Sequence, residues 1–179
     1  MKKAVFFDRD GVINEDAWPL TKIENVVLIP QIAEAIKKLN KNFLIIIVTN
    51  QGSIAKGLAT IDEIKTINNY IIQELEVQGA KIDGIYFCPH HPDFSGLCKC
   101  RKPEPGLILE SAEEHEIDLS KSFIIGDKTS DIKAGKNVGL KTILVKTGDA
   151  GKDGRCVVTP DFEANTPLDA AEIILKTTK

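Results

Sequence analysis

The sequence predicts a doubly wound α/β fold built around a parallel sheet. Short apolar runs recur along the chain, and segments with helical spacing separate them. Continuous apolar runs suit strands that are buried on both faces, as in a parallel sheet. The helical segments between them supply the crossovers that such a sheet requires. A length of 179 residues is ordinary for one domain, so we expect residues 1–179 to form a single domain.

Six apolar runs are the predicted strands. They span residues 4–7, 43–48, 82–87, 122–125, 142–145 and 156–158. Segments between these runs space their apolar residues by three and four, as amphipathic helices do. The predicted helices span residues 32–39, 61–77, 106–115, 130–138 and 168–176.

Local signals mark several ends of these elements. Thr60 and Glu63 have the spacing of a capping box at the start of the second helix. Gly79 and Gly139 follow helical segments and predict helix stops, because glycine readily adopts the left-handed conformation that ends many helices. Residues 148–154 are rich in Gly and Asp and predict an exposed loop.

Two segments interrupt the alternation of strand and helix. Residues 14–28 follow the first strand, and residues 88–105 follow the third. Both begin at the carboxyl end of a strand, where α/β proteins bind ligands, so both can overhang a site there. The first segment carries Asp16 and Trp18, and this Trp could either cover a substrate or serve packing.

Charge and hydropathy argue against several classes of partner. The formal net charge is −3 with both signs well mixed, which argues against nucleic acid or an anionic membrane as the main partner. No apolar run approaches the ~20 residues of a membrane span. The four apolar residues before Asp8 are too few for the core of a signal peptide. We therefore expect a cytoplasmic protein with a small-molecule partner.

Charged and polar residues gather where the predicted strands end. Asp8 and Asp10 alone would fit a turn that ends a strand about as well as a site. Carboxyl ends of parallel strands meet at one edge of the sheet, however, and further polar residues are expected there. These residues are Thr49, Asn50, Gln51, Arg101, Lys102, Asp127, Lys128 and Asp131. Their coincidence favours a site that binds a phosphoryl group and a cation.

Four ordered motifs at this edge resemble those of the haloacid dehalogenase superfamily of Mg²⁺-dependent phosphohydrolases. They are Asp8-Arg9-Asp10-Gly11, Thr49-Asn50, Lys102 and Gly126-Asp127 with Asp131. The resemblance implies a Rossmann-like core without a large cap domain. It also implies that Asp8 is the nucleophile and that Asp10 is first the general acid and then the general base. The negative charges of Asp8 and the substrate would raise the pKa of Asp10.

The same resemblance implies how the metal and the phosphoryl group are held. Mg²⁺ would bind Asp8, the backbone carbonyl of Asp10, and Asp127. Thr49 and Lys102 would stabilise charge on the oxygens of the transferring phosphoryl group, where electrostatics supplies most of the catalysis.

Asp131 keeps three open roles. Its carboxylate could hold a metal-bound water, hold Lys102, or cap the helix that begins near Ser130.

Three of the four cysteines cluster beside a histidine. Clustered thiolates and an imidazole in a reducing compartment favour a structural Zn²⁺ site over disulfides or free thiols. The expected ligands are Cys88, His90, Cys98 and Cys100. His91 is the competing ligand, and the resemblance selects the first histidine. Bound Zn²⁺ would order residues 88–105 and so hold Arg101 and Lys102 in position.

The resemblance also implies substrate contacts. Arg101 is expected to bind the phosphate that is not cleaved, because a guanidinium suits bidentate phosphate recognition. Lys128 would contact the same substrate, and Lys56 is either a further phosphate contact or simply solvated. The candidates for contacts with sugar hydroxyls are Asp16, Trp18, Asn50 and Gln51.

Within the superfamily the chain is most similar to the heptose bisphosphate phosphatases. These enzymes remove the 7-phosphate of D-glycero-D-manno-heptose 1,7-bisphosphate during nucleotide-activated heptose synthesis for lipopolysaccharide or surface glycans. Pro105-Gly106 and Lys128 support this resemblance, whereas the segment between His90 and Cys98 is shorter than in many such enzymes. The preferred anomer stays open, and without a large cap we expect a monomer.

Two alternatives remain. Histidinol-phosphate phosphatases resemble the chain in the same Asp-Arg-Asp-Gly motif and in the zinc loop. A zinc-stabilised module that binds phosphate esters without catalysis is the second alternative, although every expected catalytic position is filled.

Overall fold

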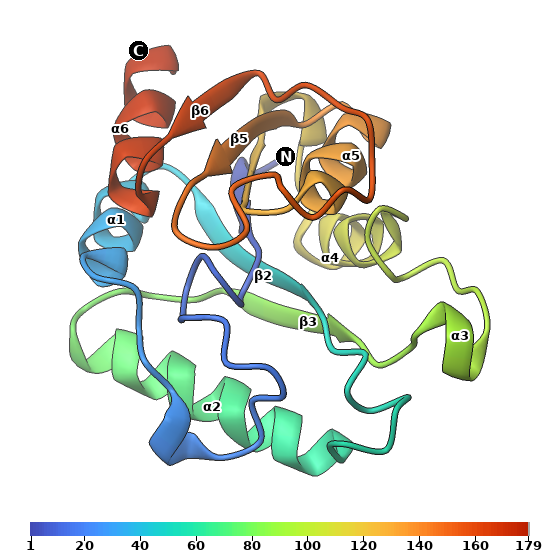
Figure 1. The fold of residues 1–179 in the computed structure, drawn as a ribbon. Helices are drawn as coiled ribbons and strands as arrows, with labels where there is room; N and C mark the ends of the chain where they lie inside the picture. Colours follow the sequence, from blue (N-terminus) through green and yellow to red (C-terminus); the bar gives the residue numbers. More distant parts are fainter. Residues whose placement is uncertain (179) are drawn as a thin grey trace.

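The computed structural model describes residues 1–178 (Figure 1). Its parallel six-stranded sheet has the strand order β3-β2-β1-β4-β5-β6. The strands are β1 (Ala4–Phe7), β2 (Leu44–Asn50), β3 (Gly84–Cys88), β4 (Phe123–Gly126), β5 (Lys141–Val145) and β6 (Phe162–Ala164). Every neighbouring pair is parallel, which confirms the predicted fold class.

Helices cover both faces of this sheet (Figure 1). The longer helices are α1 (Ile32–Leu39), α2 (Ile61–Val77), α4 (Gly106–His115), α5 (Thr129–Asn137) and α6 (Pro167–Thr177). Single-turn elements are η1 (Ile23–Asn25), α3 (Pro92–Ser95) and η2 (Leu119–Lys121). One apolar core joins the sheet to α1, α2 and α6, and a second core on the opposite face joins it to α4 and α5.

Strand β1 shows why the apolar runs lack alternation. Val5 and Phe7 pack in the first core, whereas Ala4 and Phe6 pack in the second. Successive side chains of a strand point to opposite faces, so a strand between two helical layers buries all of them. All four residues are fully buried.

Most predicted elements are confirmed, several of them to the residue. Helix α2 begins with the expected capping box, in which Thr60 and Glu63 bind each other's backbone N–H groups. Gly79 and Gly139 have φ angles of 80° and 78°, the left-handed conformation expected where a helix ends.

The strand predicted at residues 156–158 is wrong, because the sixth strand is β6. Asp161 accepts hydrogen bonds from the backbone N and the hydroxyl of Thr142, which aligns the next residues beside β5. Val157 is fully exposed instead, and the backbone N of Cys156 donates to the Thr129 hydroxyl. An apolar triplet forms a strand only where a sheet edge is available to pair with it.

The strand order places a switch point at the centre of the sheet. The chain builds β2 and β3 on one side of β1 and then continues with β4 on the other side. Ligands of open α/β sheets bind outside the carboxyl ends of strands at such a point. The described connections add no large cap domain there. In this part of the chain, no helix has both the length and the hydropathy that crossing a membrane would require.

Candidate active site

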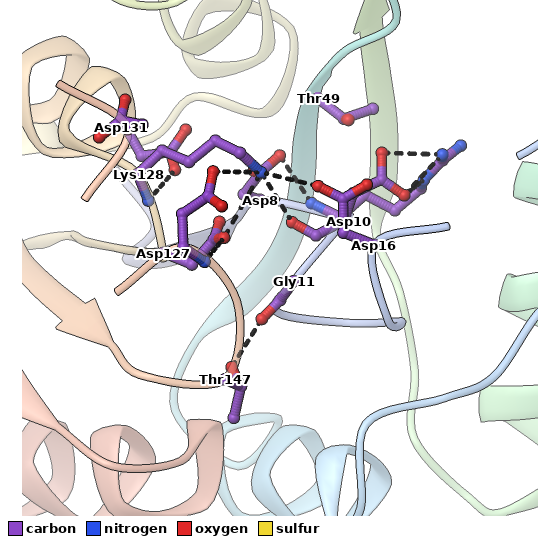
Figure 2. A network of polar contacts seen from close by, with 12 residues as sticks. Asp8, Asp10, Gly11, Asp16, Thr49, Asp127, Lys128, Asp131 and Thr147 are labelled. Atoms are coloured by element: carbon purple, nitrogen blue, oxygen red, sulfur yellow. Dashed lines mark hydrogen bonds and ion pairs between the residues drawn. The ribbon is translucent and has the colours of Figure 1, made fainter. Parts of the chain in front are cut away.

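A cleft of about 310 Å³ opens at the carboxyl ends of β1, β2 and β4. It is lined by most of the predicted site residues: Asp8, Asp10, Asp16, Trp18, Thr49, Asn50, Arg101, Lys102, Lys128 and Asp131. Figure 2 shows Asp8, Asp10, Asp127 and Lys128 close together beside these strand ends. The topology therefore brings together residues that lie more than a hundred positions apart in the chain.

Asp8 directly follows β1 and is held by fixed donors. Its Oδ1 atom accepts a hydrogen bond of 2.8 Å from the backbone N of Arg9 and lies 2.9 Å from the Nζ atom of Lys102. Only 4% of the residue is exposed. One carboxylate oxygen is thus anchored, which orients the side chain at the floor of the cleft.

Lys102 is a buried cation that contacts β2, helix α5 and the residue after β1. Its Nζ atom donates to the carbonyl of Val48 at 2.7 Å and lies 2.7 Å from Asp131 Oδ1 and 2.9 Å from Asp8 Oδ1. Burial opposes its charge, but the Asp131 and Asp8 carboxylates outweigh burial and raise the pKa of Lys102. The lysine is therefore a permanent positive charge beside Asp8.

Asp131 combines two of the three roles left open. Besides holding Lys102, its Oδ2 atom accepts a hydrogen bond of 3.1 Å from the backbone N of Lys128 at the start of α5. Burial, and then the charge of Asp8, raise the pKa of Asp131 to about 6. The same carboxylate thus caps α5 and positions Lys102.

In the site without substrate the pKa of Asp10 is lowered, so the expectation that the charge of Asp8 raises it is wrong for this state. Burial alone would raise it, but the guanidinium of Arg9 and hydrogen bonds from Asn14 and Gln51 hold the pKa of Asp10 below its ordinary value. Arg9 Nη2 lies 2.8 Å from Asp10 Oδ1 and 2.9 Å from Oδ2. Sequence reasoning missed Arg9, although its place between two acids of one motif was a signal.

Gln51 has a different place from the one expected for a contact with sugar hydroxyls. Its side chain is buried, and its Nε2 atom donates to Asp10 Oδ2 at 2.8 Å and to Thr49 Oγ1 at 2.9 Å. The reason is geometric, because the amide turns toward the catalytic loop rather than into the cleft. Gln51 therefore orients Asp10 and Thr49.

Asn50 lines the cleft but also has a structural task. Its amide donates to the Lys102 carbonyl at 3.0 Å and accepts from the Lys102 backbone N at 3.0 Å. This pair of hydrogen bonds ties the end of β2 to the segment that carries Lys102.

Asp127 has the features of a metal ligand. It is fully buried, and its Oδ1 atom has no hydrogen-bond partner among the described residues. Burial, and then the charge of Asp8, raise the pKa of Asp127 to about 7. Carboxylate oxygens of Asp8, Asp127 and Asp131 lie within 4.8 Å of one another. A buried acid with a free oxygen among other acids fits a divalent cation with oxygen ligands.

The position of the Lys128 ammonium also indicates that a cation can bind at this place. Its Nζ atom lies 3.5 Å from the Asp10 carbonyl oxygen and 3.4 Å from Asp127 Oδ2 (Figure 2). The Asp10 carbonyl and one Asp127 oxygen thus already face one cation, while Asp127 Oδ1 stays free of any partner among the described residues. Lys128 also pairs with Asp16 at 3.4 Å, on the segment that overhangs the cleft.

The loop predicted to be exposed packs against this site. The backbone N of Asp149 donates to Asp127 Oδ2 at 2.8 Å. A Cβ atom at Gly11 or at Gly148 would collide with the Asp127 carboxylate, so both positions require the close approach that only glycine permits. No residue of 148–154 is buried, as expected for an exposed loop, although Gly148 and Asp149 contact Asp127.

Trp18 and Lys56 lie at the rim of the cleft. Trp18 is 52% exposed, and the Lys56 ammonium lies 5.4 Å from the centre of its ring. The same ammonium lies 5.5 Å from the ring of Phe94, which belongs to α3. Lys56 thus links the two segments that overhang the site.

The four expected zinc ligands converge on one point. Cys88 Sγ lies 3.6 Å from Cys98 Sγ and 3.0 Å from Cys100 Sγ. The His90 Nδ1 atom lies 3.6 Å from Cys88 Sγ and 3.4 Å from Cys100 Sγ. Apart from the shorter separation of Cys88 and Cys100, these distances are close to the edges of a tetrahedron around an ion with bonds of about 2.0–2.3 Å, as in structural zinc sites. His91 Nδ1 instead accepts from the backbone N of Asp93.

Sequence reasoning missed one residue for which no local signal existed. Arg155 lines the cleft from the loop between β5 and β6, far from every recognisable motif. Only the path of that loop brings its guanidinium to the site.

Comparisons with known proteins agree with this geometry. A family model described as HAD-hydrolase-like matches residues 99–166. The chain is 40% identical over 153 residues to D-glycero-beta-D-manno-heptose-1,7-bisphosphate 7-phosphatase of Yersinia pestis, covering 81% of both chains. The Escherichia coli (strain K12) enzyme of the same name is 39% identical over 168 residues, covering 89% of this chain and 84% of that enzyme.

A solved structure shares the whole fold. It is the D,D-heptose 1,7-bisphosphate phosphatase from B. bronchiseptica complexed with magnesium and phosphate, 30% identical to this chain with a TM-score of 0.87. The match covers 98% of this chain and 99% of the other. The chain belongs to the D-glycero-D-manno-heptose 1,7-bisphosphate 7-phosphatase family of haloacid dehalogenase-like hydrolases.

Proposed function

We propose that this protein is a phosphatase that removes the 7-phosphate of D-glycero-β-D-manno-heptose 1,7-bisphosphate. The observation that carries the proposal is Asp8, oriented by Lys102 beside the unpaired oxygen of Asp127. The β anomer is proposed because the relatives at about 40% identity are named for it. The family resemblance places the reaction in nucleotide-activated heptose synthesis for lipopolysaccharide or surface glycans.

Asp8 is the nucleophile of the first step in this proposal. Its free carboxylate oxygen attacks the phosphorus, the bond from phosphorus to the sugar oxygen breaks, and an aspartyl phosphate forms. Lys102 and the Thr49 hydroxyl stabilise the negative charge on the other phosphoryl oxygens. Lys102 suits this task because its charge is permanent and already in contact with Asp8.

Asp10 supplies the proton transfers. In the first step it gives its proton to the leaving sugar oxygen, and in the second it takes a proton from the water that hydrolyses the aspartyl phosphate. Arg9 favours ionised Asp10 in the free site, so the resting site is set for the base role. Asp10 must therefore take up a proton when the substrate dianion binds, because a second negative charge nearby raises its pKa.

Two metal ions complete the proposal. Mg²⁺ would be held by Asp8, the Asp10 carbonyl and Asp127, and when bound it lets a phosphate anion approach a carboxylate. Zn²⁺ would be held by the other cluster: Cys88, His90, Cys98 and Cys100. The zinc loop ends in Arg101 and Lys102, so its order sets their position.

We also propose a cytoplasmic monomer formed by one domain. The absence of a large cap in the described residues leaves the segments that carry Trp18 and Phe94 to shield the cleft. Size-exclusion chromatography with light scattering tests the oligomeric state.

The test of the function measures Mg²⁺-dependent phosphate release from three substrates. They are the two anomers of the heptose bisphosphate and histidinol phosphate. The Asp8→Asn variant is the blank, because an amide cannot form the aspartyl phosphate. Preferred turnover of the β anomer, lost in the variant, supports the proposal. Preferred turnover of histidinol phosphate assigns the alternative function, and binding without turnover by both proteins assigns a non-catalytic module.

A further inference from the structure

The cleft contains two arginines that carboxylates neutralise less than they neutralise its lysines. Lys102 and Lys128, which lie beside Asp8, each contact at least two carboxylates. Arg101 and Arg155 line the same cleft and also an adjoining cavity of about 400 Å³ beside the zinc loop. Arg101 forms no ion pair within the described residues, and Arg155 faces a single carboxylate at 4.0 Å.

Arg101 is half-buried and has no ion pair within the described residues. Its Nη1 atom donates to the His90 carbonyl at 2.9 Å, which fixes the guanidinium against the zinc loop. Because Arg101 and Arg155 line the same two cavities, an anion bound there can contact both guanidinium groups and offset their positive charge.

Arg155 is oriented by a buried acid. The Asp153 side chain is only 3% exposed, and its Oδ1 atom accepts a hydrogen bond of 2.8 Å from the backbone N of Thr129 at the start of α5. Its Oδ2 atom has no hydrogen-bond partner and lies 4.0 Å from Arg155 Nε. Asp153 thus faces the Nε side of the guanidinium and leaves both Nη groups for a ligand.

We propose that Arg155, together with Arg101, binds a second phosphate of the substrate and is a specificity-determining residue. The fork of a guanidinium matches phosphate oxygens bidentately, and two such groups balance a dianion. The inference rests on the proposed function, and it adds a residue that comes from the loop between β5 and β6. Selection of a bisphosphate over a monophosphate thus depends on two loops that converge across the cleft.

The test compares two substrates and three variants. Heptose bisphosphate carries the second phosphate, whereas p-nitrophenyl phosphate carries only the one that is cleaved. Arg155→Gln removes the charge, and Arg155→Lys keeps it but loses the fork. Lys152→Gln is the matched control, because Lys152 is exposed on the same loop and forms no ion pair with the described residues. Thermal unfolding of each protein checks the fold.

Arg155→Gln is expected to raise the KM for heptose bisphosphate by about tenfold to a hundredfold, as loss of a charge-assisted hydrogen bond does. Its kcat/KM for p-nitrophenyl phosphate stays within about twofold of the wild type, because the catalytic groups beside Asp8 are untouched. The KM of Arg155→Lys for heptose bisphosphate falls between those of the wild type and Arg155→Gln. Lys152→Gln matches the wild type on both substrates. Equal losses on both substrates, or no loss on either, would overturn the inference.

A separate outcome identifies failure of the proposed function. If the wild type hydrolyses p-nitrophenyl phosphate but not the heptose, the proposed substrate is wrong. Competition by fructose 1,6-bisphosphate against p-nitrophenyl phosphate then tests Arg155 independently. Weaker competition in Arg155→Gln supports the second phosphate site, and unchanged competition overturns it.

Discussion

Arg9 binds the carboxylate of its neighbour Asp10 through both oxygens, at 2.8 Å and 2.9 Å from Nη2. The guanidinium is 1% exposed, and its Nη1 atom donates to Asn68 Oδ1 at 3.0 Å. Asn68 is a buried polar residue of α2. The relationship ties the orientation of Asp10, the proposed acid–base residue, to helix α2, none of whose described residues lines the cleft.

Arg9→Gln is expected to lower the free energy of unfolding by about 3 kcal/mol, because it leaves a buried carboxylate without its cation. It should also lower kcat by on the order of a hundredfold, since Asp10 loses its orientation. Urea unfolding and steady-state kinetics measure the two effects. Lys152→Gln is the control, because Lys152 is exposed and forms no ion pair with the described residues, and its stability should change by less than about 0.5 kcal/mol. Equal stability losses in both variants would contradict the role assigned to Arg9.

Lys102→Met is expected to reduce kcat by about a hundredfold to a thousandfold, comparable to the loss of one oxyanion donor. The variant also leaves the Asp8 and Asp131 carboxylates facing each other without a cation. A second substitution, Asp131→Asn, should recover part of the lost stability but not the activity. Thermal unfolding and kinetics of the single and double variants check this, and recovered activity would show that Lys102 acts only in folding.

Removal of one thiolate tests the zinc cluster. Cys98→Ser is expected to lower the zinc content from one ion per chain toward none, because a structural site needs all four ligands. Activity should fall as the zinc content falls, because the ordered loop sets the position of Lys102. Cys156→Ser is the control, because the Cys156 thiol lies outside the cluster. Elemental analysis measures the zinc content, and steady-state kinetics measures the activity of each protein. A wild type that contains no zinc and keeps full activity would refute the assignment.

The stability at low pH should depend on Asp161. Burial opposes its charge, but Lys136 and hydrogen bonds from Thr142 outweigh burial and lower the pKa of Asp161. A lowered folded-state pKa stabilises the fold above the unfolded value of about 3.9, and the effect is lost as the pH falls through the folded value.

Asp161→Ala should therefore cost about 1 kcal/mol at pH 7, a value discounted for partial exposure. The difference in stability between variant and wild type should narrow as the pH falls below the unfolded value of about 3.9. Unfolding midpoints of both proteins from pH 2.5 to 7 measure this difference in stability. A gap that is constant over this range would mean that Asp161 acts through packing rather than charge.

Much of the fold could be predicted because its signals are local. The buried faces of an element determine where its apolar residues lie in the sequence, so their periodicity predicts the element directly. This holds for the apolar runs of β1 and β4 and for the spacing in α1, α2 and α4. The strand predicted at residues 156–158 failed for a physical reason. Pairing with β5 depends on Asp161 binding Thr142, a contact between positions 19 apart that no local pattern records.

Most residues of the cleft and all four of the Cys/His cluster could be predicted. Several polar residues coincide at the strand ends, and three thiols cluster beside a histidine, whereas any one of these residues alone would be weak evidence. The partners of those residues could not be named. Nothing in the motif shows that Gln51 turns inward to Asp10, or that Gly148 passes against Asp127.

The sequence by itself therefore determined the fold class, the order of most elements and most of the residues that line the cleft. Only the tertiary structure decided that Arg9 holds Asp10 ionised, that Asp131 both caps α5 and holds Lys102, and that Arg155 reaches the cleft. The difference is physical. Residue type and spacing set what a side chain can do, whereas the path of the loops and the packing of distant elements set which partner it meets.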